Sequence, residues 1–143
     1  MTAKEYLTQV RKLKILIEQR EKELDRLTEQ KLGSLSGIDY SRISVKGSRR
    51  VGAPFEQAAV QSLDLAKEIA GLIGEYNRLR HTIIGQIQQL DKLEHMQVLY
   101  KRYVEEKRWE QIADEMGYSC DHIRHLHGFA LLDFAKTIKL NTQ

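Results

Sequence analysis

Residues 109–119 read WEQIADEMGYS, and this stretch decides how the C-terminal third of the chain folds. Its apolar residues recur at spacings of three and four, as on one stripe of a short helix. Gly117 is expected to end that helix in the left-handed conformation, and Ser119 is expected to cap the next helix. The stretch therefore predicts two helices joined by a tight turn. The stripe consists of Trp109, Ile112, Ala113 and Met116.

The helix after Ser119 is predicted to have one apolar and one polar face. At about 100° per residue, four apolar side chains cluster within roughly a quarter of its circumference, and we expect them to face the core. These four are Ile123, Leu126, Ala130 and Phe134. The opposite side carries Asp121, Arg124, His125 and Gly128, with Cys120 and His122 at its margins and His127 near the core boundary.

The polar face has the chemistry of a helix that reads DNA in the major groove. Arg124 could bond bidentately to guanine, and histidine can donate or accept at purine edges. Gly128, which has no side chain, would allow close approach to the sugar-phosphate wall. Because this helix carries three histidines, DNA binding is also expected to tighten as the pH falls from about 8 to 6. A solvated helix face is the alternative interpretation.

Three segments resemble region four of sigma factors, a helix-turn-helix module that reads the −35 promoter element. They are residues 98–104 (VLYKRYV), 109–119 and 123–127 (IRHLH), and the match covers about 40 of 143 residues. The whole layout, with its opening residues 1–7 (MTAKEYL), is similar to small phage and prophage transcriptional regulators of Gram-positive hosts, which are thought to control late phage genes. The resemblance implies contacts to phosphate or bases at Ser119, Cys120, Asp121, His122, Arg124 and His125. This helix has one arginine and three histidines, where sigma-like versions usually carry more Arg and Lys.

Charge in the C-terminal module is balanced. Residues 95–143 contain seven Lys and Arg and seven Asp and Glu, so non-specific attraction to phosphate should be weak unless the four histidines are protonated. A second source of positive charge, a dimer or a bound RNA polymerase is then needed. Residues 31–53 are one candidate, although such a segment is usually a solvated loop. The basic side chains that could contact the DNA backbone there are Arg42, Lys46, Arg49 and Arg50.

Residues 1–94 are predicted to be a helical scaffold, an antiparallel and coiled-coil-like hairpin. Two stretches show spacings of three and four along a seam, with Arg20 and Arg80 as polar interruptions. The first contains Tyr6, Val10, Leu13, Ile17, Leu24 and Leu27, and the second contains Ala59, Ala66, Ile69, Ile73, Tyr76, Ile83, Ile87 and Leu90. A flexible basic loop of about residues 33–53 separates them. The second helix is expected from about Pro54 to Glu94, since proline suits a helix start.

The seam could also be intermolecular. A lone two-helix hairpin leaves much apolar surface in water, and paired half-sites are common for proteins that read DNA. We therefore expect a homodimer formed through the long helices. Phe129 and Leu132 lie off the core stripe of the C-terminal module. They are expected to pack against a scaffold helix, with RNA polymerase or a second protomer as the alternative contact.

Composition excludes several other classes. The chain is 41% apolar and 30% charged, with no long apolar run and no secretory leader, which predicts a cytoplasmic protein of the bacterial host cell without a membrane span. The single cysteine excludes an intrachain disulfide. By helical phase, Cys120 and His127 project away from the pair His122 and His125, so no metal site is expected. No cofactor is expected either.

The combined prediction is an all-α protein that binds double-stranded DNA sequence-specifically and regulates transcription, with domains at residues 1–94 and 95–143. No nucleophile with a paired base, phosphate-binding glycine loop or convergent carboxylates stands out, so the chain is not expected to be an enzyme. Two alternatives stay open. One is a protein-interaction module, such as an RNA polymerase adaptor or a phage-encoded inhibitor of a host protein. The other is a small DNA-packaging subunit.

Overall fold

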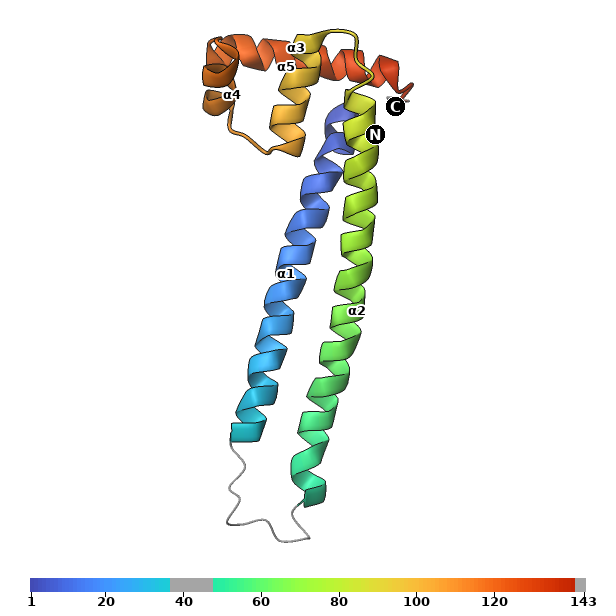
Figure 1. Cartoon of the computed structure of the whole chain (residues 1–143), viewed down its shortest axis with the longest axis vertical. Coiled ribbons are helices and arrows are strands. Elements are labelled where there is room, and N and C mark those ends of the chain that lie inside the picture. Colours follow the sequence, from blue (N-terminus) through green and yellow to red (C-terminus); the bar gives the residue numbers. More distant parts are fainter. Residues whose placement is uncertain (37–47, 141–143) are drawn as a thin grey trace. The chain divides into compact units, whose positions relative to one another are not determined.

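The computed structural model describes the backbone of residues 1–36 and 48–140 and the side chains of residues 1–29 and 56–140. Within these ranges every regular element is a helix, which confirms the predicted all-α class (Figure 1). None of the described helices is both apolar enough and long enough to cross a membrane. The helices are α1 (Ala3–Ser36), α2 (Ser48–Ile87), α3 (Leu93–Leu99), the π-helix η2 (Tyr100–Val104), α4 (Trp109–Met116) and α5 (Cys120–Thr137).

A reciprocal pair of hydrogen bonds starts α1. The Thr2 hydroxyl oxygen accepts from the Glu5 backbone N–H at 3.2 Å, and the Glu5 carboxylate accepts from the Thr2 backbone N–H at 2.8 Å. This capping box satisfies donors that have no partner inside the helix. The bond from the Thr2 backbone is also the main reason that the pKa of Glu5 is lowered.

The chain divides into two compact units. Unit 1 consists of Met1–Lys14 and Glu75–Gln143, and unit 2 consists of Ile15–Gly74. This division differs from the expected boundary between residues 94 and 95. The reason is that Leu7 of α1 and Ile87 of α2 share one hydrophobic core with the C-terminal helices.

The core of unit 1 draws on five helices. Its most buried side chains are 0–1% exposed and come from α1, α2, α3, α4 and α5, with Phe134 the largest. Such packing from several directions fixes the position of each helix, because interiors are close-packed and tolerate few alternatives. The largest of these side chains are Phe134, Leu7, Ile83, Ile87, Leu99, Ile112, Ile123 and Val98.

Unit 2 is built from one pair of helices. Leu27 of α1 packs with Leu65 and Ile69 of α2. The C-terminal half of α1 therefore meets the N-terminal half of α2. The pair is therefore antiparallel. Arg20, which interrupts the apolar seam, reaches Glu68 across the helices at 3.3 Å, with both side chains almost half exposed.

The predicted seam of α2 is partly out of phase in unit 2. Ala58 and Leu65 are buried there, whereas Ala66 is exposed and Ile73 is 38% exposed. Further along α2 the prediction is confirmed, since Ile83, Ile87 and Leu90 are buried in unit 1. The error arises because α2 carries apolar side chains on two faces, and spacing alone does not select the one that meets α1.

The predicted helix bounds also need correction. The second helix begins at Ser48 and ends at Ile87 rather than running from Pro54 to Glu94. Two hydrogen bonds tighten its end, from Gln89 N–H to Gln86 O at 3.2 Å and from Leu90 N–H to Ile87 O at 3.1 Å. Leaving the helix here lets α3 turn back and bury Val98 and Leu99 in the core that also holds Leu90.

The bounds expected for the loop, about residues 33–53, are wrong at both ends, because α1 continues to Ser36 and α2 starts at Ser48. Glycine within a helix costs only about 1 kcal/mol relative to alanine, so glycine at positions 33 and 52 did not mark the helix ends. The predicted backbone contacts Arg42 and Lys46 lie outside the described residues. The side chains of Arg49 and Arg50 do so as well.

Candidate nucleic-acid interface

The turn between α4 and α5 has the local chemistry that the sequence predicted. Gly117 has φ 73° and ψ 32°, the left-handed conformation, and its N–H donates to the Ala113 carbonyl. The Ser119 hydroxyl oxygen accepts from the His122 backbone N–H at 3.1 Å and caps α5. A side chain at a left-handed position is strained, which explains glycine there. The turn thus sets where α5 starts.

The apolar stripe of α5 faces the core, as predicted, and every residue of it is at most 9% exposed: Ile123, Leu126, Ala130 and Phe134. The expected polar positions lie together on the N-terminal half of the same helix. Ser119, Asp121, His122, Arg124, His125 and Gly128 are exposed, and Cys120 is half-buried with a free thiol. We call the surface formed by these residues the α5 polar face.

Two side chains of the α5 polar face present nitrogen atoms to solvent. Arg124 forms no ion pair with any side chain that the structure describes. The Nδ1 atom of His125 lies 2.7 Å from the Asp121 carbonyl oxygen one turn earlier, so Nδ1 donates to that carbonyl. This bond leaves Nε2 as the ring atom available to a partner, an acceptor when the imidazole is neutral and a donor when it is protonated.

His122 is held from the side by Tyr118, whose ring centroid lies 4.3 Å from that of the imidazole. The Tyr118 hydroxyl in turn donates a hydrogen bond to the Glu94 carboxylate of α3, and this bond raises the pKa of Tyr118. The imidazole of His122 is therefore partly ordered before any partner binds. This chain of contacts links the start of α3 to the start of α5.

His127 is a core residue and not part of the exposed face. It is 8% exposed, stacks on Tyr103 with 5.6 Å between ring centroids, and meets the edge of Trp109 at 4.7 Å. Burial is the main reason that its pKa falls to about 4, and the charges of Lys4 and Arg102 lower it further. Burial also raises the pKa of Tyr103 to about 12.

At neutral pH the Tyr103 O–H therefore donates to the unprotonated Nε2 of His127, at 2.7 Å. This corrects the expectation that three histidines of the helix gain charge between about pH 8 and 6. Only His122 and His125 lie on the α5 polar face. The ring cluster instead packs η2, α4 and α5 together as one block.

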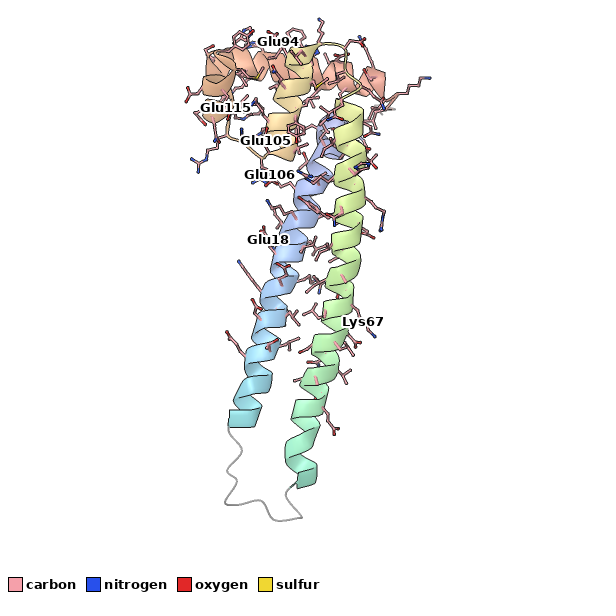
Figure 2. All side chains as sticks on the ribbon, in the orientation of Figure 1. Glu18, Lys67, Glu94, Glu105, Glu106 and Glu115 are labelled. Atoms are coloured by element: carbon pink, nitrogen blue, oxygen red, sulfur yellow. The ribbon has the colours of Figure 1, made fainter. Side chains whose placement is uncertain are left out.

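Cations elsewhere in unit 1 are partly neutralised by neighbouring carboxylates. Lys107 lies 2.6 Å from Glu115 and 3.0 Å from Glu105, and Lys101 lies 3.1 Å from Glu115. The two carboxylates, Glu105 and Glu115, are labelled in Figure 2. These bonds raise the pKa of Lys107 and lower that of Glu115. Ion pairs of this kind leave fewer cations for phosphate, which adds to the balanced charge seen in the sequence.

Phe129 and Leu132 do not pack against a scaffold helix within unit 1, contrary to expectation. Each is 62% exposed, and Leu93 at the start of α3 is 64% exposed. Phe129 and Leu132 line a shallow groove that also includes Leu126 and Lys136. The C-terminal half of α5 therefore offers apolar contacts, whereas its N-terminal half offers polar ones.

Sequence reasoning missed one polar contact that positions α5. His95 of α3 is 7% exposed, and its Nδ1 donates to the Asp133 carboxylate of α5 at 2.8 Å. The two residues lie 38 positions apart, so no local spacing reveals the pair. The capping box at Thr2 and Glu5 was also missed, although the pattern Thr-x-x-Glu before an apolar run is a recognisable signal.

Comparison with known proteins does not assign a role to these residues. No protein-family model matches the chain, and neither a curated protein nor a solved structure matches it significantly. As for metals, the described residues contain no group of three or more His, Cys, Asp or Glu side chains that could hold an ion.

Proposed function

We propose that the chain binds double-stranded DNA sequence-specifically through the α5 polar face and thereby regulates transcription of phage or prophage genes. The observation that supports this most directly is the joint exposure of Arg124, His125 and Gly128 on a helix that starts at a tight turn. A helix placed in this way can enter the major groove with its first turns against base edges. The resemblance to sigma-factor region four gives the same orientation.

Each exposed group has a distinct role in the proposed complex. Arg124 donates two bonds to guanine, and His125 offers Nε2 to a purine edge. Asp121 accepts from a cytosine amino group and disfavours misplaced phosphates. Ser119 and Cys120 lie at the helix start, where backbone N–H groups attract a phosphate of the DNA backbone.

Selection of duplexes from a random pool, followed by mobility-shift titration, tests this proposal. Arg124→Ala should weaken binding by about 1 to 3 kcal/mol and relax the preference at one base pair. Arg78→Ala is the matched control, since Arg78 is exposed on α2 and outside the α5 polar face. Unchanged affinity and preference for the Arg124 variant would remove this residue from base reading.

The two exposed imidazoles give a second test. Changing both His122 and His125 to glutamine should weaken duplex binding, because the contacts of their ring nitrogens with base edges are lost. His81→Gln, which changes an exposed histidine on α2, should leave duplex binding unchanged. Unchanged affinity in the double variant would mean that neither imidazole contacts the DNA.

The proposed DNA-binding form is a homodimer assembled through α2. In unit 2 the side of α2 that does not face α1 carries apolar residues at helical spacing, of which Val60 is 59% exposed and Leu63 57% exposed. A contiguous exposed apolar face of this kind usually marks an interaction site. We call it the second α2 face; it consists of Ala59, Val60, Leu63, Ala66, Ala70 and Ile73.

A second copy of the chain is the proposed occupant because this face is self-complementary. With a two-fold axis between positions 66 and 67 and antiparallel helices, Leu63 lies opposite the small Ala70 of the partner subunit. Val60 then lies opposite Ile73 of the partner subunit, and Lys67 comes within a helical turn of Asp64 of the partner subunit. Lys67 lies on the outer surface of α2 (Figure 2). Isologous pairing of this type sets Leu63 against a small side chain, joins two β-branched side chains and brings opposite charges together.

Light scattering on the purified full-length chain measures the assembly directly. Leu63→Glu should give a monomer, because it buries a carboxylate in the proposed interface. Ile15→Glu is the matched control, since Ile15 is an exposed apolar residue on α1, and this variant should stay dimeric. A dimeric Leu63 variant would contradict the proposed face, and a ring-sized mass would favour the packaging subunit.

The groove around Phe129 supports a second candidate function, docking to a protein partner such as RNA polymerase. Leu93, Phe129 and Leu132 are all more than 60% exposed, which suits an apolar partner better than DNA. Salt distinguishes the two functions, because DNA binding must weaken steeply with added salt. A retained partner at high salt, lost in Phe129→Ser but not in Arg124→Ala, would favour the adaptor function.

A further inference from the structure

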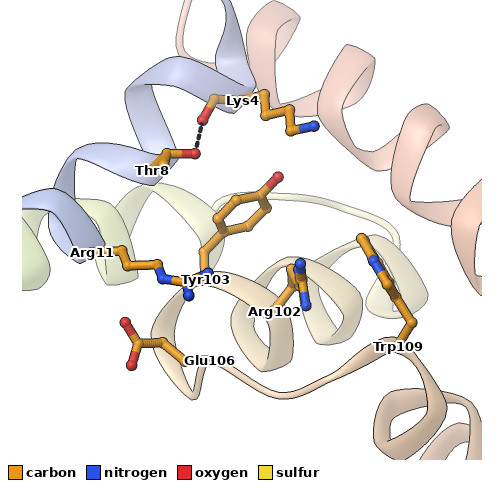
Figure 3. Close-up of a pocket in the computed structure, with 7 residues that line it drawn as sticks. All are labelled: Lys4, Thr8, Arg11, Arg102, Tyr103, Glu106 and Trp109. Carbon is orange, nitrogen blue, oxygen red and sulfur yellow. Dashed lines mark hydrogen bonds between the residues drawn. The ribbon is translucent and has the colours of Figure 1, made fainter.

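A small cavity opens in unit 1 away from the α5 polar face. Its volume is about 220 Å³, and it lies between the first turns of α1, η2 and the start of α4 (Figure 3). Lys4 and Arg11 of α1 and Arg102 of η2 line it together with Tyr103, Glu106 and Trp109. Three cations from two separated parts of the chain thus meet around one space.

The single carboxylate at the cavity is already paired. Glu106 bonds to Lys14 at 2.8 Å, whereas neither Lys4 nor Arg11 forms an ion pair with any side chain of the described ranges. Thr8 donates its hydroxyl to the Lys4 carbonyl at 2.5 Å and so is committed locally. The side chains that line the cavity therefore carry more positive than negative charge.

Arg102 is fixed in place before any ligand arrives. Its guanidinium lies 4.2 Å from the centre of the Trp109 ring, and one of its terminal nitrogens donates to the Lys107 carbonyl at 2.9 Å. A cation–π contact and a backbone bond hold the planar group in one orientation, which leaves its other N–H donors available. Preorganised arginine donors are well suited to phosphate oxygens.

The positive charge at the cavity also affects the neighbouring imidazole of His127. After burial, Lys4 and Arg102 are the groups that lower the pKa of His127, which contacts both Tyr103 and Trp109. An anion placed between Lys4, Arg11 and Arg102 would relieve the repulsion among these three cations. It would also link α1 to the block formed by η2, α4 and α5.

We propose that this cavity is a binding site for a phosphate group held by Lys4, Arg11 and Arg102. Its volume of about 220 Å³ is below the roughly 300 Å³ at which drug-sized ligand sites begin, so it fits one phosphate group and not a whole nucleotide. The group can be a free phosphate ion or a phosphate of a nucleic-acid backbone. The proposal stands on the cavity and does not depend on the DNA-reading role of α5.

Intrinsic fluorescence can follow occupancy, because Trp109 is the single tryptophan of the chain and lines the cavity. Inorganic phosphate titrated into the full-length protein at constant ionic strength should give a saturable change and a higher melting temperature. Arg11→Gln should weaken this binding at least tenfold. Arg78→Gln, which removes an equal charge from the exposed surface of α2, should leave it unchanged.

Three results would overturn the site. They are a response that does not saturate, the same response to chloride at equal ionic strength, and unchanged phosphate binding in Arg11→Gln with a wild-type circular dichroism spectrum. The first two would mean an adventitious ion only. Lys4→Gln, expected to weaken binding in the same way, guards against a misleading result from a single variant.

A duplex titration separates the two sources of the phosphate group. If the group belongs to the nucleic-acid backbone, Arg11→Gln reduces the salt dependence of duplex binding by about one ion, and free phosphate competes with the duplex beyond its ionic-strength effect. If the group is a free ion, duplex affinity is the same in wild type and Arg11→Gln. Because the fluorescence assay contains no DNA, failure of the DNA-binding proposal leaves the result on this site intact.

Discussion

Unit 1 and unit 2 share the two long helices α1 and α2, yet they are stabilised very differently. Among the described side chains, the buried cluster of unit 1 has 14 residues, drawn from five helices and the residue Leu90 that follows α2. In unit 2, where the side chains of residues 15–29 and 56–74 are described, the buried cluster has three residues drawn from two helices. Hydrophobic stabilisation grows with the apolar surface removed from water, so the larger buried cluster gives unit 1 a core of its own. Unit 2 leaves a second apolar face of α2 exposed. We therefore expect unit 1 to carry recognition and unit 2 to carry assembly.

Truncating a core side chain in each unit should show the largest effect. Phe134→Ala should destabilise unit 1 by about 3 to 5 kcal/mol, because it leaves a cavity that the packed helices do not fill. Leu65→Ala should cost about 2 kcal/mol, at the low end for such a change, because Leu65 is 8% exposed beside a two-helix seam. Hydrogen exchange resolved by segment measures both losses. Equal losses would contradict the contrast between the units.

Acidification should destabilise unit 1 through His127. Its pKa in the folded protein is about 4, below the usual 6.5, so the unfolded chain binds more protons between these values. Stability is then complete above about pH 6.5 and falls by up to about 3 kcal/mol as the pH drops towards 4. Urea unfolding at both pH values measures this loss. His127→Phe should remove the pH dependence, and His81→Gln should keep it.

Three glycine-to-alanine changes should have smaller effects. A Cβ atom at Gly71, Gly85 or Gly128 would meet nothing within 4 Å. Each change should stabilise its helix by about 1 kcal/mol, in unit 2 for Gly71 and in unit 1 for the others. Thermal unfolding checks this gain. The change at Gly128 also tests the idea of close approach to DNA.

Only Gly128→Ala should reduce DNA affinity, because its new methyl group would lie on the α5 polar face. Gly85→Ala is the matched control for stability without a change in binding. If Gly128→Ala binds DNA as tightly as wild type, the backbone at that position does not approach the sugar-phosphate wall.

The smallest effect is expected for the ion pair in unit 2. Arg20→Ala removes the contact of 3.3 Å with Glu68, but exposed pairs contribute at most about 1 kcal/mol. Chemical unfolding at low and high salt should show a loss below that value that disappears in high salt. A larger loss would show that Arg20 sets the register of α1 on α2.

Predictions from the sequence were most accurate for α4, the turn and α5. Gly117 and Ser119 act through hydrogen bonds to residues three or four positions away, so their roles can be read locally. The buried stripe of α5 follows from helical period alone. The end of α2 at Ile87 was missed, since it depends on Leu90, Val98 and Leu99 reaching the same core. The roles of the α5 polar face and of the phosphate site remain predictions.

The sequence by itself determined the local features of this protein: the helical class, the turn at Gly117, the cap at Ser119 and the core stripe of α5. These depend on interactions between residues close together in the chain. Only the tertiary structure decided which face of α2 meets α1, that His127 is buried between Tyr103 and Trp109, and that Phe129 is exposed. The burial of a side chain depends on contacts from every neighbouring helix, and the apolar period of one helix does not predict those contacts.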